Sequence, residues 1–156
     1  MYLTLYNLAG VAMLGWLMLI LLPGWRVTRW AARVELFPVL LAVIYVVGIV
    51  PMIVRSPEMM RDFGSAEGVL RLLGISDVAL IAWIHLLAFD QAVATMIFRD
   101  NQEHRYLPLP VQSVLLFLTL MFGPAGFLAY YALRAWIRWR RESASHPAAP
   151  APVALA

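Results

Sequence analysis

Four long apolar runs, separated by shorter polar stretches, dominate the pattern of positions along the chain. The runs cover residues 3–22, 36–54, 78–98 and 111–133. Each has about the 20 residues that an α-helix needs to cross the hydrocarbon core of a bilayer. We therefore predict an all-α, polytopic membrane protein with a single domain, residues 1–141, that forms a bundle of four transmembrane helices.

The first run could instead be a cleaved signal peptide. Such a peptide begins with basic residues and ends at a cleavage site of small residues. Here the first basic residue is Arg26, and the run is followed by Pro23, Gly24 and Trp25. The pattern therefore favours a retained helix.

The polar stretches also predict local structure. Residues 24–35 combine arginines with two tryptophans, which is typical of a turn at the membrane interface. Within residues 55–76, serines that can cap helices and glycines that can end them indicate two short helices at the membrane surface, although an ordinary loop fits equally well. A kink or an open turn is expected at Gly123, Pro124 and Gly126 in the fourth run. Residues 142–156 are rich in alanine and proline, which predicts a disordered tail.

Composition agrees with a membrane protein and excludes several kinds of chemistry. Hydrophobic residues make up 63% of the chain and charged residues only 13%. The chain has no cysteine, which excludes disulfides, thiolate metal sites and cysteine nucleophiles. It also has no lysine, which excludes a Schiff base. The twelve basic residues are all arginines, scattered between the runs, so we expect membrane lipids as partners and no nucleic acid.

Two ionisable residues, His85 and Asp90, lie inside the third run. Ionisable groups within a membrane span are costly and are therefore candidates for function. Asp90 is near the middle of the run and must be protonated, paired or next to a wet cavity; we expect it to be a neutral acid. The two residues lie about 140° apart around a helix. We take both as candidate catalytic residues and expect both to face the bundle interior.

A structural role is the alternative for each of these residues. His85 could be a neutral imidazole bonded to a neighbouring helix, and Asp90 could bond Thr119 or Tyr130 to hold two helices together. A transmembrane haem with two histidine ligands is disfavoured, because His85 is the only histidine inside a run. Asp100 and His104 have helical spacing but lie at the membrane edge. We therefore expect no metal and no cofactor.

The third and fourth runs resemble a known family. The third contains the pattern Trp-x-His-x4-Asp, from Trp83 to Asp90, and the fourth contains Phe-Gly-Pro-x-Gly, from Phe122 to Gly126. In this order and spacing they resemble the abscisic-acid-deficient-four-like proteins, the membrane family that includes plant neoxanthin synthase. The resemblance covers roughly residues 3–137. One departure stands out: family members commonly carry an arginine five residues after the aspartate, where this chain has Thr95.

The resemblance implies an enzyme, or a component of one, that acts on a carotenoid or another isoprenoid lipid within the bilayer. The plant reaction converts an epoxide to an allene without redox change, and a carboxyl and an imidazole could supply the acid and the base. A cofactor-independent isomerase is therefore one hypothesis; a non-catalytic lipid-binding or scaffold protein is the alternative. Residues that could contact the lipid are Trp83, Phe89, Asn7, Thr119 and Tyr130.

Partners and orientation complete the expectations. A homo-oligomer or an enzyme partner is possible, and the arginine-only, alanine-rich composition suggests the inner membrane of a bacterium. If all four runs cross, seven arginines lie on the side of both termini and five on the other side. The positive-inside rule then predicts that both termini are cytoplasmic.

Overall fold

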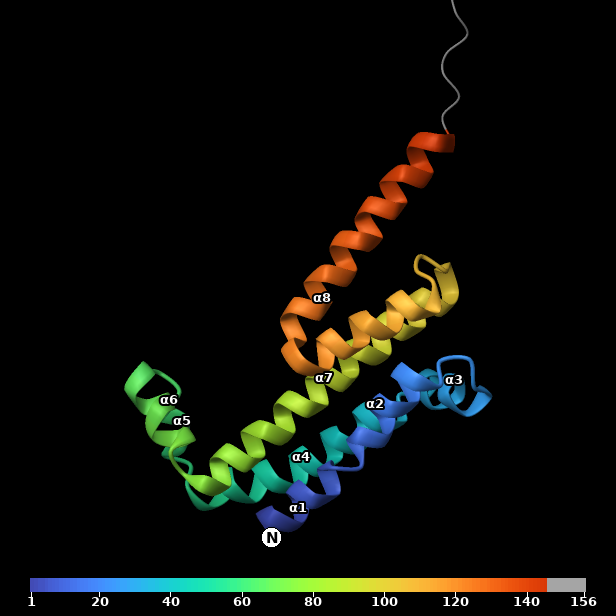
Figure 1. Cartoon of the computed structure of the whole chain (residues 1–156). Coiled ribbons are helices and arrows are strands. Elements are labelled where there is room, and N and C mark those ends of the chain that lie inside the picture. Colours follow the sequence, from blue (N-terminus) through green and yellow to red (C-terminus); the bar gives the residue numbers. More distant parts are fainter. Residues whose placement is uncertain (146–156) are drawn as a thin grey trace, which may run out of the picture.

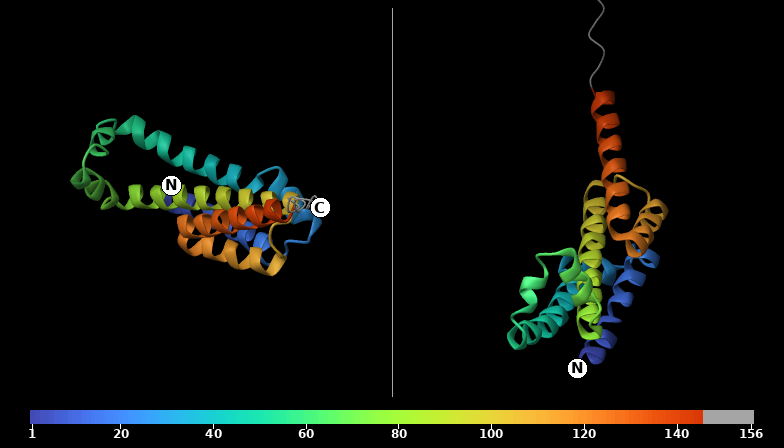
Figure 2. Two further views of the ribbon diagram at one scale, coloured as in Figure 1. Left: turned by 90° about the horizontal axis from the view of Figure 1, so that it is seen from above. Right: turned by 90° about the vertical axis from the view of Figure 1, so that its left-hand side faces the viewer.

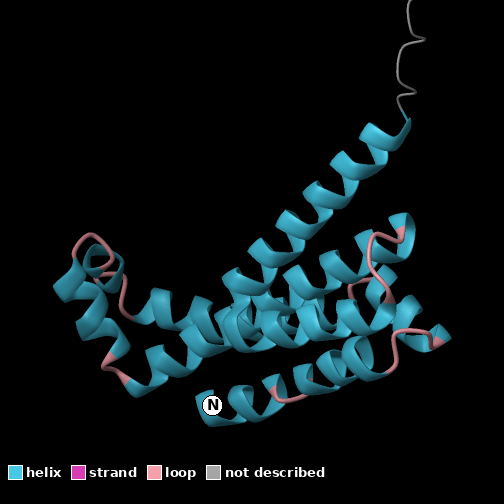
Figure 3. Cartoon of the chain, turned by 45° about the horizontal axis from the view of Figure 1, so that its top comes forward, coloured by secondary structure: helices cyan, strands magenta, loops and turns pink. Residues whose placement is uncertain are grey.

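The computed structural model describes residues 1–145, and all regular structure within them is α-helical (Figure 1, Figure 3). The helices are α1 (Tyr2–Ala9), α2 (Ala12–Leu21), α3 (Arg26–Arg33), α4 (Leu36–Arg55), α5 (Met59–Asp62), α6 (Ala66–Leu73), α7 (Ser76–His104) and α8 (Leu109–Ser145). Counting α1 and α2 together, four helical stretches are long and apolar enough to cross a membrane. The predicted all-α, multi-pass membrane protein is thus confirmed.

Helix α7 is the centre of the bundle, with α1, α2 and α4 packed along it. A small residue allows the closest of these contacts: a Cβ added at Gly48 of α4 would overlap the side chain of Ile81 and lie 3.2 Å from Leu5. The core is therefore continuous between α1, α4 and α7 near the middle of the bundle. Towards α5 and α6 the helices α4 and α7 diverge, as the left view of Figure 2 shows.

Helix α8 is broken and folds back on itself (Figure 1). Phe122 and Gly123 leave the helical conformation, with φ/ψ of −139°/41° and 0°/−76°. The second arm, residues 124–145, then returns beside the first arm, residues 109–121. Two contacts establish the reversal: Arg141 donates a 3.0 Å hydrogen bond to the carbonyl of Arg105, just before α8, and a Cβ at Gly126 would lie 2.5 Å from the backbone nitrogen of Thr119.

The reversal bears on the predicted membrane topology. The first arm has thirteen residues and is about 20 Å long, too short to cross a hydrocarbon core of about 30 Å. The fourth apolar run therefore enters the bundle to about half its depth and leaves at the end where it entered. The N-terminus lies towards the end with α5 and α6 (Figure 1), whereas the last part of α8 reaches the opposite end of α7, where Arg141 bonds the Arg105 carbonyl. The prediction that both termini share one side requires four full crossings and stays a prediction, and the hairpin indicates the alternative in which they lie on opposite sides.

The connections largely follow their sequence signals. Ser65 caps α6 by accepting a 3.1 Å hydrogen bond from the backbone of Gly68, and Gly74 follows the last residue of that helix. Residues 55–76 thus contain two short helices, α5 and α6, and their place at the membrane surface stays a prediction. Helix α8 continues through Ser145, four residues beyond the predicted domain boundary at 141. The remainder of the predicted tail, 146–156, lies outside the described residues.

Candidate functional site

Asp90 lies at the middle of α7, beneath the turn of the α8 hairpin. An ideal Cβ at Gly123 would overlap its Oδ1 atom, so any other residue at this position would force the Asp90 side chain to move. Asp90 is half-buried and has no hydrogen-bond or ion-pair partner among residues 1–145. The two sequence patterns that carry the family resemblance therefore meet at one point, Asp90 against Gly123.

A mostly apolar cavity of about 260 Å³ opens beside the same face of α7. Trp83 and Leu87 of α7 line it, and Asp90 follows Leu87 by three residues, within about 60° of it around the helix. The opposite wall is the junction of α1 and α2, where tightened turns such as the 3.0 Å bond from Val11 N–H to the Leu8 carbonyl replace the regular helical pattern. The cavity lies next to Asp90 along α7.

Polar groups reach this cavity from α1 and α2. Asn7, a predicted lipid contact, lines it together with Trp16. The indole of Trp16 is 1% exposed, and its Nε1–H has no acceptor within the described part of the chain. An unpaired buried donor costs free energy unless a ligand or water accepts from it. The structure thus brings Asn7 and Trp83 to one cavity and adds Trp16. That Asn7 and Trp83 contact a lipid stays a prediction.

His85 does not share this site. Its ring lies between Tyr45 of α4, at a centroid distance of 5.0 Å, and Phe89, at 4.7 Å. The side chain is exposed on the surface of the chain and makes no hydrogen bond within residues 1–145. The expectation that it faces the bundle interior is wrong, because the 140° offset turns it towards α4 and away from the hairpin. Phe89, 61% exposed, belongs to the same outward face.

Thr119 and Tyr130 are buried and bonded elsewhere. The Thr119 hydroxyl donates a 2.9 Å hydrogen bond to the Leu115 carbonyl within its own helix. Tyr130 donates to Asp100, near the end of α7. Neither residue bonds Asp90, so the predicted alternative in which they hold Asp90 in a structural contact is also wrong. Gly123, Pro124 and Gly126 do mark the predicted break in the helix.

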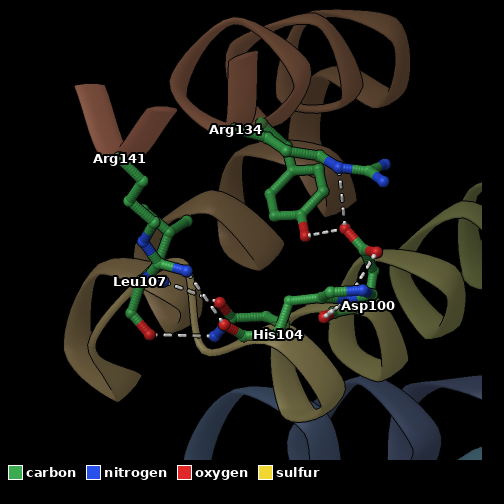
Figure 4. A network of polar contacts seen from close by, with 7 residues as sticks. Asp100, His104, Leu107, Arg134 and Arg141 are labelled. Atoms are coloured by element: carbon green, nitrogen blue, oxygen red, sulfur yellow. Dashed lines mark hydrogen bonds and ion pairs between the residues drawn. The ribbon is translucent and has the colours of Figure 1, made fainter. Parts of the chain in front are cut away.

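Asp100 organises a polar network that fastens the second arm of α8 to the end of α7 (Figure 4). Besides Tyr130, its carboxylate lies 3.3 Å from Arg134 Nε and 3.3 Å from His104 Nδ1. Arg141 adds the bond to the Arg105 carbonyl. Asp100 therefore has several partners, and its role is to close the hairpin.

A second buried polar group, Gln91, follows Asp90 directly. It is completely buried, and neither amide atom has a partner among the described residues. It lines a cavity of about 10 Å³ with Thr28 and Thr95, which is room for about one water molecule. Thr95, at the position of the family arginine, thus lies on a different face of α7 from Asp90.

Sequence reasoning did not single out Gln91, Trp16 or Arg134. The available signal for Gln91 was an uncharged polar residue in the middle of an apolar run. Trp16 and Arg134 gave no local signal, because their burial depends on contacts between distant helices.

Comparison with known proteins gives one match. The family model described as ABA DEFICIENT 4-like matches residues 4–130, which is most of the chain. No curated protein and no solved structure matches the chain.

Proposed function

Because the chain belongs to the ABA DEFICIENT 4-like family, we propose that it binds a carotenoid or another isoprenoid lipid inside the membrane and isomerises it without a cofactor. The observation that carries the proposal is Asp90: an acid at mid-span depth, unpartnered within residues 1–145, covered by the hairpin turn and next to an apolar cavity. An unpartnered acid at that depth is costly, and such a cost usually reflects function.

The cavity favours an elongated apolar ligand with a small polar group. Trp83, Leu87 and Met13 offer apolar surface, while the Asn7 amide can bond an oxygen of the ligand. The cavity volume of about 260 Å³ accommodates only part of a carotenoid. We therefore place one end group of the lipid here and its chain along the lipid-facing surface of the bundle.

Asp90 alone can donate the proton that an isomerisation needs and take one back. As a neutral acid, it donates its proton to the oxygen of a ring ether of the lipid, such as an epoxide; one C–O bond breaks, and the oxygen stays on the lipid as a hydroxyl through its other C–O bond. The resulting carboxylate then removes a proton from a neighbouring carbon, which restores the acid and leaves an isomer with one new double bond. This sequence needs no base from His85, which lies on the other side of α7.

The test uses cells that produce carotenoids and other isoprenoid lipids and express this protein. The purified protein should carry a bound lipid, and its extract should contain an isomer of unchanged mass that is absent from control cells. Asp90→Asn should retain the bound lipid and lose at least about 100-fold in isomer formation, the lower range for general acid catalysis. Asp77→Asn, an exposed aspartate on the same helix, is the matched control and should behave like the unaltered protein.

Two outcomes would contradict the proposal. Native-rate conversion by a folded Asp90→Asn variant would remove the acid role. A bound lipid without any isomer would favour the non-catalytic alternative, a membrane protein that binds a lipid or scaffolds a partner enzyme.

A further inference from the structure

A basic cleft lies between α3 and the end of α7, at the opposite end of the bundle from α5 and α6. Its volume is about 330 Å³, within the range of small ligand sites. Arg29 and Arg33 of α3 form one wall, and α7 forms the other with Phe98, Arg99, Gln102 and Glu103. Three arginines against one glutamate make the lining positive.

The packing of α3 explains why its arginines point into this cleft and the surrounding headgroup region. Thr28, Ala31 and Ala32 are buried against the bundle, so the other side of this eight-residue helix carries the charges. Arg29 and Arg33 are one helical turn apart, where like charges repel. Within residues 1–145 neither of them pairs with a carboxylate, whereas Arg99 pairs with Glu35. An anion between Arg29 and Arg33 would remove the repulsion.

Two tryptophans indicate the level at which the cleft lies in the membrane. Trp25 is the N-cap residue of α3 and Trp30 lies within the helix, and they are 51% and 55% exposed. Exposed tryptophans favour the interface between hydrocarbon and water, at the level of the lipid headgroups. The anion within reach of Arg29 and Arg33 at that depth is a headgroup phosphate, and exposed apolar residues beside it, such as Val34, can contact acyl chains.

We propose that this cleft binds the phosphate of an anionic glycerophospholipid, with Arg29 and Arg33 as the two cationic contacts. Basic pockets between transmembrane helices are a known chemical solution for holding anionic headgroups. Arg99, fixed by Glu35, closes the cleft on the α7 side, and Gln102 offers a hydrogen-bond donor for headgroup hydroxyls. This site is separate from Asp90 and does not depend on the proposed catalytic function.

The test measures lipids retained by the purified full-length protein in native mass spectrometry, after exchange into vesicles of phosphatidylglycerol or phosphatidylcholine. We expect at least one phosphatidylglycerol to be retained and phosphatidylcholine to be lost. Arg29→Gln with Arg33→Gln should weaken retention about tenfold or more. The matched control, Arg55→Gln with Arg61→Gln at the other end of the bundle, should leave retention unchanged. Equal retention of both lipids, or unchanged retention in the α3 variant, would overturn the proposal.

Two further measurements keep the test decisive. Arg29→Lys with Arg33→Lys preserves the charges and should retain phosphatidylglycerol, which covers the case in which the glutamine variant fails to fold. Inorganic phosphate distinguishes a lipid from a free anion. If phosphate alone raises the melting temperature and displaces phosphatidylglycerol at millimolar concentration, the cleft is a site for a free anion and the lipid assignment is wrong.

Discussion

Two aspartates ten residues apart on α7 have opposite surroundings. Asp100 accepts a hydrogen bond from Tyr130, lies at ion-pair distance from Arg134 and His104, and fastens the second arm of α8 to the end of α7. Asp90, nearer the membrane centre, has no such partner within residues 1–145, although the hairpin turn covers it. A buried carboxyl with several partners stabilises the fold, whereas one without partners costs free energy. The comparison therefore assigns Asp100 to structure and Asp90 to function.

The largest expected effect concerns the hairpin that both aspartates touch. If α8 folds back, nine of the twelve arginines lie at the end with α3 and three at the end with α5 and α6; all twelve lie within the described residues. The positive-inside rule then places Ser145 in the cytoplasm and Met1 on the opposite side. Because the chain has no cysteine, the single cysteine substitutions Thr4→Cys and Ser143→Cys each provide one thiol that can be labelled from either side of the membrane. We expect labelling from opposite sides. Labelling of both from one side would exclude the hairpin.

Removing the structural aspartate should have the next largest effect. Asp100→Ala leaves Arg134 and Tyr130 without their acceptor, which should lower the free energy of unfolding by about 3 kcal/mol. Glu58→Ala, an exposed acid outside this network, is the control and should change stability by less than about 0.5 kcal/mol. Unfolding in detergent, followed by circular dichroism, gives both values. Equal stability of the two variants would show that the network does not hold the hairpin.

These contacts show how much of the molecule the sequence could predict. The place of Asp90 at the middle of its helix, the break at Gly123 and the α6 cap all follow from local patterns, and all are present. The direction of the chain after Gly123 does not follow, because a proline or glycine break permits many angles. The reversal depends on Gly126 against Thr119 and on Arg134 against Asp100, contacts between residues whose proximity no periodicity reveals.

The same limit applies to the candidate site. The spacing of His85 and Asp90 correctly placed them on different sides of α7, but it could not show which side meets α8. Likewise, Trp16 lines a cavity only because α2 passes α7 at that level. Sequence patterns thus predicted which residues lie within a helix and where along it they lie. Which neighbouring helix packs against each face was seen only in the structure.

The close packing of the two arms should tolerate little extra volume. A Cβ at Gly126 would lie 2.5 Å and 2.6 Å from the backbone nitrogen and Cα of Thr119, where no side chain can move aside. Gly126→Ala should therefore cost about 2 kcal/mol of unfolding free energy. Gly24→Ala, with no atom within 4 Å of the added Cβ, should be neutral. Thermal unfolding of both variants checks the difference, and a neutral Gly126→Ala would argue against the packed hairpin.

The smallest of the expected effects concerns a single hydroxyl. Tyr130→Phe removes the donor to Asp100 but keeps the buried ring, so it should cost about 1 kcal/mol. Tyr6→Phe, at an exposed position of α1, should show no change in the same unfolding assay. If Tyr130→Phe is also silent, Asp100 acts through Arg134 and His104 alone.

The contrast between the two aspartates is tested most directly by one measurement, the free energy of unfolding of Asp90→Asn beside that of Asp100→Asn. Both substitutions remove a charge and keep the size of the side chain. The account predicts that Asp90→Asn leaves stability unchanged or raises it, because an unpartnered acid is lost, while Asp100→Asn lowers it by at least about 1.5 kcal/mol. An equal or greater loss in Asp90→Asn would contradict the account, because Asp90 would then be a structural residue.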